Sequence, residues 1–417
     1  MSLILFVALL SVPPDTLDLD LCYREAVARY PLRGEIDLQS RVEDSRISAL
    51  QSNYLPQLTL RGDATYQSEV PDFADFPAAF APPVISHDQY HITLGAEQLI
   101  YDGGRIASEK AVAAAEAAEA RQQVEVSLYE LRDRVNQAYF GALLLQARLS
   151  TLAALHDDIR ARLEIVDAQV TNGVLLQSNA DVLRVELIAV EQQQIGSEKQ
   201  RLASLGVLGG LIGQDLDPST HLQVPARTSS GAASDAARRP EYTLFSRAKS
   251  TLASRIGQTA RSNYPNVAAF GDASYGRIPG LNMFENDLTP YYAFGLRMSW
   301  KLWDWKSNQR RHQALRLQQE IVDVREATFA KNIDLALQRQ VRDVERLEEL
   351  IQRDDEIIAL RKRIVEQTES QLENGVITAT EYLLERNAAY RAELTREQHA
   401  IQLAQAHAQI LTTIGEE

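Results

Sequence analysis

The chain of 417 residues is an internal duplication, and this limits its possible folds more than any single motif. Residues 52–66 (Ser-Asn-Tyr-Leu-Pro, continuing to Gly-Asp-Ala-Thr-Tyr) recur at 262–275 (Ser-Asn-Tyr-Pro, continuing to Gly-Asp-Ala-Ser-Tyr). Further matches join 28–31 to 237–240, 101–102 to 303–304, 172–174 to 374–376, and 211–213 to 413–415. The copies span about 28–213 and 237–415, so each is expected to build the same supersecondary unit.

The offset between the copies shows where their lengths differ. It is 209 or 210 up to Tyr66 and 202 from Asp102 onward. Because insertions collect in exposed loops, we expect a surface loop between these two residues.

Each copy begins with a helical pattern, roughly 34–54 and 238–262, and then alternates with a period of two. We predict strands at 55–67, 90–101, 265–276 and 291–303. In the clearest strand, Phe294, Leu296 and Met298 alternate with Arg297 and Ser299. One apolar and one polar face are typical of a strand between two different media.

The segments between the paired strands, 68–89 and 276–290, are rich in Pro, Asp, Phe and Asn, and Tyr or Trp residues cluster at the strand ends. Short alternating strands with aromatic residues at both ends and longer loops indicate an outer-membrane barrel. The alternative is a soluble antiparallel sheet with one wet face.

Very long helices are predicted after each strand pair. Asp102 and Asp304 stand where a helix N-cap is expected, and no Pro follows as far as Val170 and Leu372. The predicted helices, 102–171 and 304–373, would each be on the order of 100 Å long. An unbroken 3-4 apolar spacing between residues 124 and 170 predicts a coiled-coil seam. Asn-Gly turns lead to return helices at 179–213 and 379–415, and 214–236 reads as a connector.

The predicted fold is an α+β membrane protein with an internal two-fold repeat, in which a β-barrel is continued by a long α-helical coiled-coil barrel. Four strands leave unpaired backbone edges in lipid, so several chains must close the barrel. Two chains would give eight strands and three would give twelve, which is wide enough for a lumen. These residues alone do not choose three chains over four.

The remaining features set limits on function. Residues 1–14 contain a short apolar run that we interpret as a possible signal peptide; a buried N-terminal segment is the alternative. No other stretch is expected to cross a membrane as a helix. A net charge of −14 argues against nucleic-acid binding. No metal spacing among the seven His, phosphate loop or nucleophile motif appears, so we expect neither a cofactor nor enzyme activity.

Several short motifs stand out beside the order of elements and the duplication: Leu19-Asp20-Leu21-Cys22, Tyr54-Leu55-Pro56-Gln57-Leu58, Asp102-Gly103-Gly104, Arg239-Pro240-Glu241, Asn172-Gly173-Val174 and Asn374-Gly375-Val376. Together these features resemble the TolC family of outer-membrane efflux and export channels over nearly the whole chain. This resemblance implies a homotrimer with a twelve-stranded barrel, a periplasmic helical tunnel, and docking to a periplasmic adaptor and an inner-membrane pump.

By the same resemblance, acidic residues shortly after each Asn-Gly turn form a selective ring at the narrow end of the tunnel. Glu381 lies six residues after Gly375. Asn179 has that spacing in the first copy, but Asp181 is the better match if two extra residues lie there. Three copies would place six carboxylates around a lumen, which favours cations and makes the constriction sensitive to pH and divalent ions. The alternative is that both are solvated residues at helix starts.

Two further groups of residues are assigned. The turns would meet the adaptor, with a simple helix-hairpin turn as the alternative: Asn172, Gly173, Val174 and Leu175, and Asn374, Gly375, Val376 and Ile377. The polar strand residues Arg61, Asp63, Glu97, Arg297 and Lys301 are expected to face the lumen. An Arg and a Tyr that lock the tip in some relatives are replaced here by Ile377 and Leu372.

The expected function is therefore an exit duct in the outer membrane of a Gram-negative-type bacterium, with a large periplasmic part and contact with outer-membrane lipid. It would serve a tripartite efflux system or a type I secretion system and pass solutes from the periplasm or the pump to the exterior. The alternative is a non-transporting periplasmic coiled-coil scaffold, which leaves the apolar strand faces without a purpose.

Overall fold

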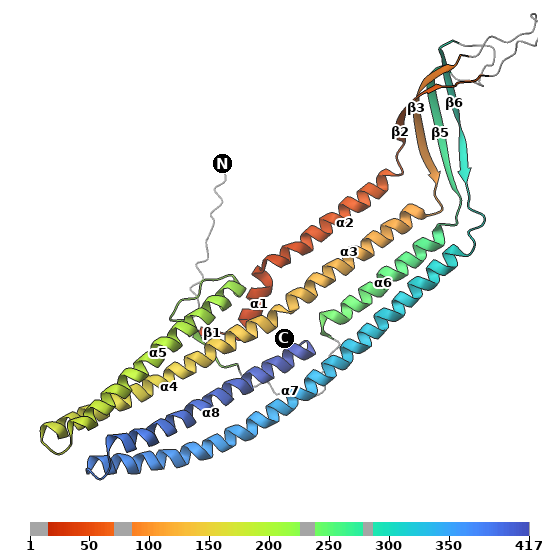
Figure 1. Ribbon diagram of the computed structural model, residues 1–417. Coiled ribbons are helices and arrows are strands. Elements are labelled where there is room, and N and C mark those ends of the chain that lie inside the picture. The colour runs from red at the N-terminus through yellow and green to blue at the C-terminus, as the bar shows by residue number, and fades with distance from the viewer. Residues whose placement is uncertain (1–15, 71–85, 226–237, 278–286, 417) are drawn as a thin grey trace, which may run out of the picture. The chain divides into compact units, whose positions relative to one another are not determined.

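The computed structural model describes residues 16–70, 86–225, 238–277 and 287–416. The expected signal segment 1–14 lies outside this range, as do most of the two strand-connecting loops and about half of the connector. The elements, in chain order, are β1 (Thr16–Leu17), α1 (Leu19–Arg29), the 3-10 helix η1 (Pro31–Arg33), α2 (Gly34–Ser52), β2 (Gln57–Tyr66), β3 (Asp88–Tyr101), α3 (Arg105–Tyr129), α4 (Leu131–Thr171), α5 (Gln177–Ile212), β4 (His221–Leu222), α6 (Pro240–Arg261), β5 (Asn266–Gly276), β6 (Thr289–Ser299), α7 (Ser307–Glu373) and α8 (Ala379–Ile414) (Figure 1).

The chain divides into two compact units, and neither coincides with one sequence copy. The sheet unit comprises 36–122 and 244–325, and the helical unit comprises 1–35, 123–243 and 326–417. Each unit takes segments from both copies. The copies at 15–213 and 237–417 are therefore repeats in sequence and not separate compact bodies.

In the sheet unit, four antiparallel strands lie in the order β2-β3-β5-β6 (Figure 1). Arg61 pairs with Thr93, Glu97 with Phe270, and Phe270 with Gly295. The fourth strand ends at Ser299, four residues before the predicted end at 303. Ser299 pairs with Asn266, the first residue of β5, so no partner strand continues beyond it.

The helical unit is built from helical hairpins. Helices α4 and α5 form one hairpin, and α8 packs against α4 (Figure 1). Of the predicted seam, Val135, Leu152, Ile159 and Val166 are fully buried. A second part of the core includes Cys22 of α1 and the parallel pair β1-β4, where the Tyr139 hydroxyl lies within hydrogen-bond distance of the carbonyls of Leu17 (2.9 Å) and Gln223 (2.7 Å) and can donate to either.

The long helices differ in detail from the prediction. The first is interrupted for one residue at Glu130, whose backbone stays in the right-handed helical region. Both helices begin three residues later than predicted, because the Asp residues precede them and cap from outside. Asp102 Oδ2 accepts from the backbone N–H of Ile106 at 2.7 Å, and Asp304 Oδ2 accepts from that of Asn308 at 2.9 Å. The return helix α5 begins at Gln177, two residues earlier than predicted.

One helical stretch, within Arg105–Thr171, is long and apolar enough to cross a membrane by length and composition, contrary to the expectation of none. Its mean hydropathy is 1.3. Its apolar side chains include Tyr139, Ala142 and Leu143, which are buried in the core of the helical unit. The composition of this stretch is explained by helix packing.

Candidate channel lining and tip

The sheet has one polar and one apolar face, because directly paired residues in adjacent strands point to the same side. The pairing register places Arg61, Asp63, Glu97 and Arg297 on one face. Arg297 Nη1 lies 3.3 Å from Glu97 Oε2, across β5. Lys301 follows the end of β6 and is exposed. Four of the five predicted lumen residues thus share a single face.

A shallow depression of about 500 Å³ lies on this polar face, and its lining includes Arg61, Glu97, Asp272 and Arg297. Gly95 makes room for it, because a Cβ there would lie 2.8 Å from Asp272 Oδ1. Cations and carboxylates are mixed in this lining.

The opposite face of the sheet is apolar and exposed over all four strands. Its large side chains are Leu58, Leu60, Tyr66, Tyr90, Ile92, Leu94, Tyr275, Tyr292, Phe294, Leu296 and Met298. A contiguous apolar surface of this size marks contact with a membrane or another protein.

The two hairpin turns of the helical unit resemble each other closely. Gly173 and Gly375 have φ values of +73° and +67°, a conformation that favours Gly at the end of a helix. Val174 and Val376 are 63% and 71% exposed. Leu175 and Ile377 instead pack against the core of the helical unit. Each turn therefore presents one Val outward and fixes the next residue inward.

The residues expected to form the acidic ring all have partners within the chain. The start of α8 has a capping box, in which Thr378 Oγ1 accepts from the backbone N–H of Glu381 and the Glu381 carboxylate accepts from that of Thr378. Glu381 Oε2 accepts from the backbone N–H (2.8 Å) and the hydroxyl (3.0 Å) of Thr378. These bonds hold the pKa of the Glu381 carboxyl below its ordinary value. Asp181 Oδ1 accepts from Arg184 Nη1 at 2.9 Å. Asn179 Oδ1 accepts from the backbone N–H of Ala379 at 3.0 Å and so links α5 to the start of α8.

Near the tip, a charged network joins the two hairpins, and sequence reasoning missed it. Arg386 Nε donates to Asp158 Oδ2 at 2.7 Å, and the Tyr382 hydroxyl donates to the same oxygen at 3.2 Å. Arg162, with only 6% of its side chain exposed, donates to Glu373 at 2.8 Å and also pairs with Glu369. Burial raises the pKa of Tyr382 to about 12, so its hydroxyl remains a donor.

One sequence signal for this network exists. Arg162 follows Leu155 and Ile159 and precedes Val166 on the buried stripe of α4. A lone cation in an apolar stripe needs a counter-charge, which the sequence does not identify.

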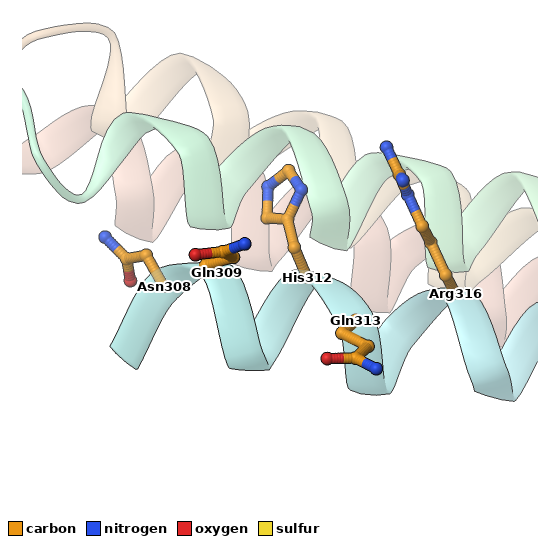
Figure 2. Close-up of a pocket in the computed structure, with 5 residues that line it drawn as sticks. All are labelled: Asn308, Gln309, His312, Gln313 and Arg316. Atoms are coloured by element: carbon orange, nitrogen blue, oxygen red, sulfur yellow. The ribbon is translucent and has the colours of Figure 1, made fainter. Parts of the chain in front are cut away.

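A second depression, of about 450 Å³, lies along the first turns of α7. Figure 2 shows that Asn308, His312 and Arg316 point toward α6 and that Gln313 points away. No carboxylate lines it, and in the part of the chain that the structure describes no three His, Cys, Asp or Glu side chains gather to hold a metal ion.

These features define a class of protein: outer-membrane channels in which two-faced strands lead directly into long helical hairpins. Residues 24–214 match the family model of the outer membrane efflux protein. No curated protein sequence matches the chain.

Solved structures share the fold. CusC has a TM-score of 0.68 at 13% identity, over 96% of this chain and 92% of its own. VceC from Vibrio cholerae has a TM-score of 0.65 at 16% identity, over 95% of this chain and 96% of its own. The open state of the MtrE channel from Neisseria gonorrhoeae has a TM-score of 0.64 at 16% identity, over 95% of this chain and 89% of its own. The predicted resemblance to the TolC family is confirmed, and the protein is placed in the outer membrane with a large periplasmic part.

Proposed function

We propose that three copies of this chain form a continuous duct that passes solutes from the periplasm, or from an inner-membrane pump, to the exterior. The observation that carries this proposal is the two-faced sheet with open edges. Among the described strands, β2 and β6 each have a partner on one side only. Unpaired edges are not tolerated in lipid, so copies of the chain must pair edge to edge. The apolar face then meets lipid and the polar face encloses the lumen.

Exposed apolar stripes on the helices support the same assembly. On α7, Leu317, Ile321 and Val324 are exposed at 3-4 spacing, and on α2 the exposed residues Leu38 and Val42 are four apart. Stripes with this spacing pack well against another helix. We assign them to the contact between adjacent protomers, where α7 of one chain meets α2 of the next.

For the tip, we propose that Asp181 and Glu381 of three chains surround the narrow end of the duct. Glu381 uses Oε2 for the cap, and no described residue bonds its other carboxylate oxygen. Arg184 partly neutralises the charge of Asp181, so Glu381 contributes the larger negative charge to the tip. Asn179 acts in this arrangement as a cap that fixes the start of α8. The exposed Val174 and Val376 would meet the periplasmic adaptor, and the pump would choose between small solutes and polypeptides.

The assembly is tested on protein extracted in detergent. We expect a particle of three 46.6 kDa chains by light scattering. Ile321→Asp should dissociate it by placing a charge in the stripe, whereas Gln318→Asp, on an exposed position of the same helix, should leave it intact. A folded monomer that stays in solution without detergent would refute the duct and favour the scaffold.

A further inference from the structure

The junction between β6 and α7 combines aromatic and basic residues in a way found nowhere else in the chain. All three Trp residues, Trp300, Trp303 and Trp305, lie within six positions. Between Asp304 and Glu320 there are four Lys or Arg residues and no acidic residue, in a chain of net charge −14. We call Trp303, Trp305, Lys306, Arg310 and Arg311 the aromatic–basic corner.

In the single chain, the corner is exposed. Trp303 and Trp305 are 68% and 79% exposed, and their rings meet edge to face at 5.8 Å. Lys306, Arg310 and Arg311 are exposed, and none forms a salt bridge with any residue that the structure describes. The corner lies directly after the apolar face of β6, where Phe294, Leu296 and Met298 are exposed.

The equivalent junction in the first copy has no Trp and carries Glu109 among its basic residues, and Tyr101 occupies the position of Trp303. Gly103 and Gly104 occupy the positions of Trp305 and Lys306, with φ values of +65° and +82°. Trp305 and Lys306 keep this left-handed backbone, at +54° and +61°, although side chains disfavour it. Arg311 stands at the position of Glu109, which pairs with Arg105 at 3.0 Å. Packing within the chain does not explain the substitutions, since these side chains are exposed.

We propose that the aromatic–basic corner binds the headgroups of anionic phospholipids in the periplasmic leaflet of the outer membrane. Trp side chains prefer the headgroup level of a bilayer, and Lys and Arg near the surface attract anionic lipids. The apolar face of β6 would continue into the acyl chains above the corner. The proposal rests on the outer-membrane location and not on the acidic ring or on transport.

Because the chain has no Trp elsewhere, Trp fluorescence, excited at a wavelength that Tyr does not absorb, reports on this junction alone. The full-length protein is reconstituted into vesicles that contain brominated phosphatidylglycerol or brominated phosphatidylcholine, since bromine quenches Trp on contact. A cation near the surface favours an anionic lipid roughly fivefold. With three cations, we expect phosphatidylglycerol to be preferred at least about tenfold at low salt, and less at high salt because charges are screened.

The variant Lys306→Gln/Arg310→Gln/Arg311→Gln should reduce the preference to within about twofold. The matched control Arg342→Gln/Arg346→Gln/Arg353→Gln removes three exposed cations from a distant part of α7 and should retain it. Equal quenching of the wild-type protein by both lipids would by itself overturn the proposal, and no variant would then be needed. Loss of the preference in the control, or quenching by neither lipid, would also overturn it.

A free anion is distinguished from a lipid by adding inorganic phosphate. Millimolar phosphate should leave the preference nearly unchanged at constant ionic strength. If it abolishes the preference, the corner is a site for soluble anions and the lipid proposal fails. Pore formation is measured on the same vesicles, so that failure of the duct and failure of the lipid site are separate results.

Discussion

Arg386 Nε of α8 lies 2.7 Å from Asp158 Oδ2 of α4, so one carboxylate joins the two hairpins of the helical unit. The Tyr382 hydroxyl donates to the same oxygen at 3.2 Å, and Arg162 lies over the Tyr382 ring at 5.5 Å. This network lies in the stretch that leads to the tip turns. In the duct that we propose, it holds the hairpins together when the tip is closed.

Removing the shared carboxylate should therefore weaken the helical unit. Asp158→Ala leaves Arg386 without this partner, and we expect a loss of about 2 kcal/mol in the free energy of unfolding. The measurement is urea unfolding in detergent, followed by circular dichroism. Glu345→Ala is the control, because its pair with Arg342 is largely exposed and should contribute less than about 1 kcal/mol. Equal effects of the two variants would contradict the role of the network.

Arg162→Met should act on the tip more than on the rest of the fold. The substitution keeps most of the apolar volume but removes the bonds to Glu369 and Glu373 of α7. We expect more frequent or larger openings of single channels in a planar bilayer. Arg342→Met, which removes a distant surface cation, should leave the openings unchanged; unchanged openings in Arg162→Met would show that this pair does not hold the tip.

The cap of α8 should depend on pH. The Thr378 bonds hold the pKa of Glu381 below its ordinary value of 4.5, so the unfolded chain binds more protons in this range. The carboxylate of the cap therefore contributes its full share of the free energy of unfolding above about pH 5. This share is lost as the pH falls through the lowered pKa. Thr378→Ala should cost about 1 kcal/mol at pH 7 and less at acidic pH. A cost that does not change with pH would contradict this role of the carboxylate.

Two glycines with the same backbone conformation should respond differently to substitution. At Gly103, a Cβ would lie 2.4 Å from the Cβ of Tyr264, whereas nothing lies within 4 Å at Gly173. Gly103→Ala adds this clash to the left-handed strain and should cost about 3 kcal/mol. Gly173→Ala should cost only about 1 kcal/mol. Thermal unfolding of both variants measures the difference in their losses of stability. Similar losses would show that the clash at Gly103 adds nothing to the backbone strain.

Much of the fold was predictable because it depends on periodicity. The period of two in 291–303 identifies the two faces of a strand, and the 3-4 spacing between residues 124 and 170 identifies the seam of a helix. Neither inference requires knowledge of the segment that packs against it. The register then placed Arg61, Asp63, Glu97 and Arg297 together, since residues that pair directly across adjacent strands have their side chains on the same face.

What could not be predicted depends on contacts between distant segments. Asp158 and Arg386 are 228 positions apart, and nothing in their local sequence pairs them. Asn179 has the spacing of a ring residue at the tip, and the structure shows that its side chain caps α8. Trp305 and Lys306 adopt a left-handed backbone that their residue types disfavour, and only comparison with Gly103 and Gly104 suggests it.

The most direct test of a channel with an acidic ring is single-channel conductance of the purified protein in a planar bilayer, with and without divalent cations. We predict a cation-selective pore that divalent cations block, and relief of the block in Asp181→Ala/Glu381→Ala. Thr378→Ala is the control, because it disturbs the cap but keeps the carboxylate, and it should remain sensitive to block. A pore that is indifferent to the double substitution would refute the ring, and protein that forms no pore would contradict the channel itself.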